Sequence, residues 1–150
     1  MIKRFEQFTA AISSIHRFIQ KIERDEMEKY GLKGACAQYL LAMAAHPEGI
    51  TASELCEICN KDKAAVSRIL NEMEAKGLVI RDSGSDTQYR VRLTLTETGK
   101  QAADFVNQKA ALAAELVGKG LSPEDRKAFY TSLALIAANI EALSNQGIPD

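Results

Sequence analysis

Arg68 and Asn71 stand three residues apart in a segment whose apolar residues recur at helical spacing. An arginine can bond guanine and an asparagine can bond adenine, so this pair could read base edges in the major groove of DNA. A rotation of about 100° per residue puts Ala64 on the same helix face, where a small side chain permits close approach, with Lys63 and Ser67 beside it. The alternative is the solvated face of an ordinary amphipathic helix.

Two short helices position these residues. Thr51 and Glu54 have the spacing of a capping box, which predicts that a helix begins there and ends at Asn60, a residue that tolerates left-handed geometry. Asp62 is well placed as the N-cap of the next helix, which ends at Lys76-Gly77. The pattern therefore predicts two helices joined by a tight turn.

A β-hairpin is expected to follow, with strands at 78–81 and 89–95 and a turn at 82–86. In its second strand apolar residues alternate with polar ones, so Arg90 and Arg92 should face solvent, where they could hold DNA phosphates or the minor groove. Helix, turn, helix and basic hairpin are the order of a winged helix-turn-helix, in which one helix reads base edges and the hairpin is the wing.

The outer helices carry apolar stripes. One stripe near the N-terminus and another in the last helix repeat at three- and four-residue spacing, which favours burial against a partner helix. They consist of Phe5, Phe8, Ile12, Ile15, Ile19 and Ile22, and of Phe129, Leu133, Ile136, Ile140 and Leu143. We expect a mainly α protein with a small β-hairpin wing, a single domain over 1–150. Residues 1–30 and 97–145 would form dimerisation helices, and 33–96 the winged helix-turn-helix.

Charge and composition limit the alternatives. The net charge is −1, yet the segment from Lys61 to Arg92 has seven basic and five acidic residues and is locally positive. No apolar run is long enough to span a bilayer, and the first residues lack the apolar core of a signal peptide. Three cysteines without framework spacing indicate reduced thiols. We therefore expect a cytoplasmic location and no membrane partner.

Other candidate sites are weaker. Cys56 and Cys59 form a C-x-x-C pair, but without a second pair of ligands we expect core packing and no metal. Cys36 near a helix start is a candidate oxidation sensor, because thiolates are favoured at helix N-termini. His16 and Arg17, with Tyr39, are candidates for lining a ligand pocket, although ordinary packing is the alternative. The sequence contains no recognisable catalytic arrangement and no phosphate-binding loop. We therefore expect that the protein is not an enzyme and binds no cofactor.

The chain resembles the MarR family in two runs, TASELCEICNKDKAAVSRILNEMEAKGLVIR and VRLTLTETG. The resemblance implies a DNA-binding homodimer joined by its first and last helices, usually a repressor released by a small ligand or by thiol oxidation. Because a dimer presents two reading helices, its operator would be an inverted repeat in double-stranded DNA. Two departures stand out: the family's wing Asp-x-Arg falls on Thr87 and Tyr89, one residue from Arg90, and Ala64 and Ala65 replace hydroxyl residues. The rival functions are a protein-interaction module built on a winged helix, and a thiol or metal sensor.

Overall fold

The structure is a computed structural model that describes residues 1–82 and 91–148. It divides into two compact units, 1–109 and 110–150. The boundary lies inside a long helix, whereas the sequence was interpreted as a single domain, an interpretation that stays a prediction. None of the described helices combines the length and apolar character needed to cross a bilayer.

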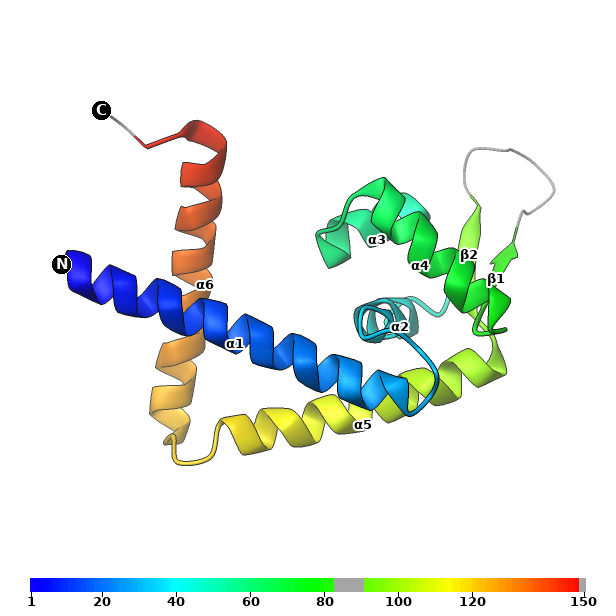
Figure 1. Cartoon of the computed structure of the whole chain (residues 1–150), viewed down its shortest axis with the longest axis horizontal. Helices are drawn as coiled ribbons and strands as arrows, with labels where there is room; N and C mark the ends of the chain where they lie inside the picture. The colour runs from blue at the N-terminus through cyan, green and yellow to red at the C-terminus, as the bar shows by residue number, and fades with distance from the viewer. Residues whose placement is uncertain (83–90, 149–150) are drawn as a thin grey trace. The chain divides into compact units, whose positions relative to one another are not determined.

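The described elements follow the order expected from the sequence (Figure 1). The six helices and two strands of the described residues are α1 (Ile2–Glu28), α2 (Cys36–Ala44), α3 (Ala52–Cys59), α4 (Lys63–Ala75), β1 (Val79–Asp82), β2 (Arg92–Leu95), α5 (Glu97–Val117) and α6 (Pro123–Gln146). The mainly α fold with a two-stranded hairpin is confirmed. Asp82, predicted to begin the turn, is the last residue of β1. The rest of the predicted turn and the start of the predicted second strand, with Thr87, Tyr89 and Arg90, lie outside the described residues.

Local hydrogen bonds explain where α3 and α4 begin and end. The Thr51 hydroxyl accepts from the backbone N–H of Glu54 at 3.2 Å, and the Glu54 carboxylate accepts from the Thr51 N–H at 2.7 Å, which completes the predicted capping box. Asn60 ends α3 with a φ of 50°. Asp62 then accepts from the Ala65 N–H at 2.8 Å and caps α4. The tight turn between the helices is thus as predicted.

The core of the first unit lies under α2, α3, α4 and the hairpin. Its fully buried side chains include Leu40, Leu55, Leu70 and Leu93. β1 and β2 pair antiparallel with Val79 opposite Leu95 and Arg81 opposite Leu93. Ile50, just before α3, forms a bridge with Leu93, so the hairpin is attached directly to the helix-turn-helix. This attachment fixes the base of the wing relative to α4.

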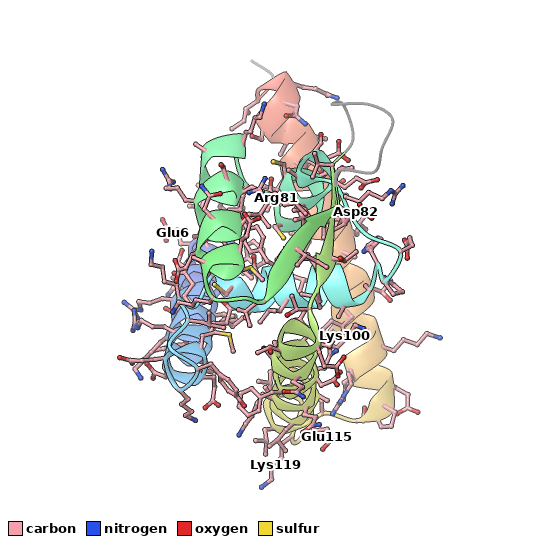
Figure 2. All side chains as sticks on the ribbon, turned by 90° about the vertical axis from the view of Figure 1, so that its right-hand side faces the viewer. Glu6, Arg81, Asp82, Lys100, Glu115 and Lys119 are labelled. Atoms are coloured by element: carbon pink, nitrogen blue, oxygen red, sulfur yellow. The ribbon has the colours of Figure 1, made fainter. Side chains whose placement is uncertain are left out.

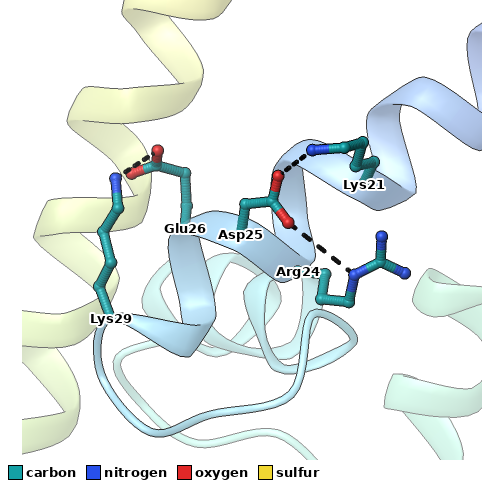
Figure 3. A network of polar contacts seen from close by, with 5 residues as sticks. All are labelled: Lys21, Arg24, Asp25, Glu26 and Lys29. Carbon is teal, nitrogen blue, oxygen red and sulfur yellow. Dashed lines mark hydrogen bonds and ion pairs between the residues drawn. The ribbon is translucent and has the colours of Figure 1, made fainter.

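The C-terminal end of α1 has a network of exposed ion pairs (Figure 3). Lys21 and Arg24 both approach the Asp25 carboxylate, and Lys29 lies 2.6 Å from Glu26. Because exposed ion pairs contribute little to stability, we expect this network to add little to the free energy that holds α1 folded.

Candidate nucleic-acid interface

One face of α4 is exposed and the other is buried, as the helical period predicted. Val66, Leu70 and Met73 belong to the core. The opposite face is exposed along its length and carries small, polar and basic side chains, with the exposed carboxylate of Glu74 at its edge. The small, polar and basic residues are Lys63, Ala64, Ser67, Arg68, Asn71 and Ala75. We call these six residues the α4 face. A helix with such a face fits the width of the major groove, and its polar groups can contact base edges.

Arg68 lies near the middle of the α4 face. Among the described residues, no carboxylate or carbonyl accepts a hydrogen bond from its guanidinium. A guanidinium that forms no pair within the protein keeps all its donors for an outside acceptor. Arg68 is therefore the strongest candidate for contact with a base or a phosphate.

Asn71 is exposed but already bonded. Its Oδ1 accepts from Nη2 of Arg81 at 3.0 Å, and Nε of Arg81 donates to Oε2 of Glu74 at 2.9 Å. Arg81 lies on β1 beside α4 (Figure 2). The sequence indicates Arg81 only as one of the seven basic residues between Lys61 and Arg92. Its position just after the Gly77-Leu78 step, close to the end of α4, was the signal that could have indicated a contact with that helix.

Arg92, predicted to hold the DNA backbone, is exposed on β2. Its Nη1 donates to the carbonyl oxygen of Gly49 at 2.8 Å, so one of its donors stabilises the turn before α3. The remaining guanidinium donors are still available to a phosphate. A DNA contact by Arg92 stays a prediction, and so does one by Arg90, which lies outside the described residues.

The cysteines differ in depth. Cys36 is fully buried at the start of α2, and burial raises the pKa of its thiol, with a further contribution from the Glu72 carboxylate. Lys33, a cation near the start of α2, pairs with Glu72 at 2.9 Å. A buried thiol of raised pKa is the opposite of what a sensor needs. The redox role of Cys36 stays a prediction that the structure makes harder to sustain.

Cys56 and Cys59 are partly buried on α3 and pack against the core, in agreement with the packing interpretation. Burial also raises the pKa of the Cys59 thiol. Among the described residues, no three His, Cys, Asp or Glu side chains come together as metal ligands would.

The proposed ligand-binding residues differ in how far their side chains are exposed to solvent. His16 and Arg17 are exposed on α1, and the Arg17 guanidinium lies 5.2 Å from the centre of the Phe18 ring. Tyr39 is buried in α2, and this burial raises the pKa of its hydroxyl. A hollow of about 350 Å³ in the first unit is lined elsewhere, with Tyr30, Lys76 and Gln101 among its residues. The role of His16, Arg17 and Tyr39 in ligand binding stays a prediction.

The apolar stripes of the outer helices are exposed within the chain. On α1, Phe5, Ile15 and Ile22 expose 61%, 49% and 53% of their surface. On α6, Phe129, Ile140 and Leu143 are exposed to a similar degree. Contiguous apolar surface of this kind marks an interaction site in a soluble protein.

Comparison with known proteins agrees with this geometry. Residues 30–88 match the model of the MarR family. The chain is 28% identical over 97 residues to a transcriptional regulatory protein proposed for the hcr operon of Thauera aromatica, a match that covers 65% of this chain and 55% of the relative. The chain thus spans little more than half the length of this curated relative.

Solved structures resemble nearly the whole chain. A MarR family transcriptional regulator from Silicibacter pomeroyi is 27% identical, with a TM-score of 0.73 and 87% of both chains covered. A second, from Listeria monocytogenes, was crystallised with 26mer DNA; it is 21% identical, with a TM-score of 0.82, over 95% of this chain and 96% of its own. These relatives are named as transcriptional regulators and not as enzymes.

Proposed function

Because residues 30–88 match the model of the MarR family, we propose that the chain is a homodimeric winged-helix repressor of transcription. The proposed target is double-stranded DNA containing an inverted repeat. The observation that carries the proposal is the α4 face, which is small, polar and exposed, with Arg68 forming no pair among the described residues. Activity on DNA also implies a cytoplasmic location.

The homodimer rests on the apolar stripes of α1 and α6. A soluble monomer rarely exposes apolar patches of this extent, and a two-fold dimer would cover both stripes of each protomer with the same stripes of its partner. Ile15→Asp, which places a charge in the α1 stripe, should dissociate the dimer in sedimentation at micromolar concentration. Lys3→Asp changes the charge of the same helix outside the stripe and should leave the dimer intact. A wild-type chain that sediments as a monomer would contradict this part of the proposal.

Release from DNA by a small ligand is the form of regulation that we favour. The hollow near Tyr30 and Lys76 offers space in the first unit, whereas oxidation of Cys36 would need a thiol that is buried and of raised pKa. Titrating candidate ligands against a protein–DNA complex would test this choice. Peroxide that releases DNA from wild type but not from Cys36→Ser would favour the thiol sensor instead.

DNA recognition is tested by selecting bound sequences from random duplexes. Wild type should enrich an inverted repeat with half-sites about one helical turn apart. Arg68→Ala should lose roughly 1 to 3 kcal/mol per half-site and blur base preference, because a guanidinium in the groove supplies sequence-dependent hydrogen bonds.

Arg92→Ala should behave differently from Arg68→Ala. If Arg92 neutralises a phosphate, its loss weakens all sequences alike and lowers the slope of log affinity against log salt by about 0.9 per half-site, or about 1.8 for the dimer on its full operator. Lys119→Ala removes an exposed charge outside the winged helix and should change neither quantity. Wild type that enriches no sequence would contradict the proposal and favour a protein-interaction module.

A further inference from the structure

Arg81 connects the first strand of the wing to the exposed face of α4. Its guanidinium donates to Glu74 at 2.9 Å and to Asn71 at 3.0 Å, and these two acceptors stand one helical turn apart. Two bonds to separate residues fix the plane of the guanidinium. Figure 2 shows Arg81 on β1, one residue before Asp82 and the end of the described strand.

The bond from Arg81 decides how Asn71 is oriented. An asparagine amide has one oxygen that accepts and one nitrogen with two donor hydrogens, whereas a guanidinium has donors only. The amide atom that faces Arg81 must therefore be the oxygen, which leaves Nδ2 directed elsewhere. Among the described residues no group accepts from this nitrogen, and the side chain is exposed.

We propose that Arg81 determines specificity by presenting Asn71 to DNA as a hydrogen-bond donor, so that this position of α4 reads guanine rather than adenine. Bidentate recognition of adenine needs the asparagine oxygen to accept from N6 while its nitrogen donates to N7. The bond from Arg81 occupies one of the two lone pairs of that oxygen and fixes the direction of the amide, and so it competes with the orientation that the bidentate adenine contact needs. Guanine offers two acceptors in the major groove, N7 and O6, which match a donor alone. This inference rests on the proposed function, and it specifies which base of the operator the protein prefers opposite Asn71.

The exposure of the three residues makes the inference testable in folded protein. The side chains of Arg81 and Glu74 are 39% and 42% exposed, and exposed ion pairs contribute little to stability. Arg81 therefore acts as a positioning residue for Asn71 more than as a support of the fold. Substitutions of Arg81 should leave a folded protein.

The test compares sequences selected from random duplexes by wild type and variants. Wild type should prefer guanine at the base facing Asn71. Arg81→Met keeps the aliphatic stem but removes the donors, so the freed oxygen should shift preference toward adenine, with the guanine-to-adenine ratio falling roughly tenfold. Glu74→Gln is the matched control, because it removes the charge pair but leaves the bond between Arg81 and Asn71; its preference should stay that of wild type.

Two further variants separate positioning from direct contact. Asn71→Asp can still accept from Arg81 but has no donor, so it should lose the guanine preference; this variant decides the question if Arg81→Met does not fold. In an Asn71→Ala background, Arg81→Met should cause no additional change in preference, because Arg81 acts through Asn71. If Arg81 had a purely structural role, its substitution would weaken binding to all DNA sequences equally and would not change the base preference.

The outcomes distinguish this inference from the proposed function. Wild type that enriches no sequence overturns both. Wild type that enriches an inverted repeat, while Arg81→Met keeps its base preference or Asn71→Asp keeps guanine, overturns this inference alone. A further shift caused by Arg81→Met in the Asn71→Ala background would also overturn it, since Arg81 would then contact the base itself.

Discussion

Replacing Gly99 by alanine should destabilise the base of the wing. Gly99 lies in the first turn of α5, where a Cβ would stand 2.0 Å from the carbonyl oxygen of Leu78 and 3.0 Å from its carbon. That oxygen accepts from the Thr96 N–H at 2.9 Å, a bond that joins the start of β1 to the start of α5. The added methyl group and this carbonyl would compete for the same space.

The magnitude follows from the distance. A carbon and a carbonyl oxygen in contact are about 3.3 Å apart or more, so the backbone must move by more than about 1 Å. Overpacking of this kind costs about 1 to 3 kcal/mol, and a weakened hydrogen bond adds about 1 kcal/mol. The intrinsic gain of alanine over glycine in a helix offsets about 0.5 to 1 kcal/mol. We expect Gly99→Ala to lower the free energy of unfolding by about 2 kcal/mol.

Urea unfolding followed by circular dichroism, at one fixed protein concentration, measures this loss. Thr98→Ala is the matched control, since Thr98 is the exposed neighbour on the same helix and its truncation introduces no clash. It should change stability by less than about 0.5 kcal/mol. The reasoning would be refuted by a Gly99→Ala protein as stable as wild type with an unchanged denaturant slope.

Three other outcomes are expected. In native protein, an alkylating reagent should modify Cys36 more slowly than Cys56, because Cys36 is fully buried and burial raises its pKa; mass spectrometry that finds Cys36 modified first would contradict this. Thr51→Ala should lower the free energy of unfolding by about 1 kcal/mol at neutral pH through loss of the cap, as measured by urea unfolding. This loss should shrink in acid. Bonds from the backbone N–H and the hydroxyl of Thr51 lower the pKa of Glu54, and Thr51→Ala removes only the hydroxyl bond. The part of the loss that involves Glu54 is therefore present above the ordinary carboxyl pKa and disappears as the pH falls through the lowered folded-state value. A Thr51→Ala effect that stays constant across this range would show that only the bond from the Glu54 N–H to the Thr51 hydroxyl contributes.

The helix boundaries could be predicted because they depend on nearby residues. Thr51, Asn60 and Asp62 act within three or four positions of themselves, and the structure confirms each role. Thr96 just before α5 acts over the same short range, because its hydroxyl accepts from the Gly99 N–H at 3.0 Å. The buried side of α4 followed from helical period alone. Helix caps and helical periodicity involve residues close together in the chain, so the sequence alone contains the information needed to predict them.

How deeply a side chain is buried, and which side chains it contacts, depend on residues that lie far apart in the chain. A helix start suggested an accessible thiol at Cys36, but the packing of α2 beneath the other helices buries it completely. The same packing buries Tyr39, which helical spacing alone could not separate from an exposed ligand contact. A one-dimensional pattern indicates which face of a helix is apolar but not how deeply its ends are covered.

The basic residues show why charge counting is a poor guide to this interface. Arg68, Arg81 and Arg92 count equally in the sequence, yet Arg81 is bonded to two residues of α4 and Arg92 donates to Gly49 forty-three positions away. The pairing of β1 with β2, and of Leu93 with Ile50, brings these partners together. Of the three, only Arg68 keeps its whole guanidinium free of hydrogen bonds among the described residues. The excess of positive charge between Lys61 and Arg92 is therefore less available to DNA than its count suggests, and base recognition must depend on how Arg68 and the amide of Asn71 are presented.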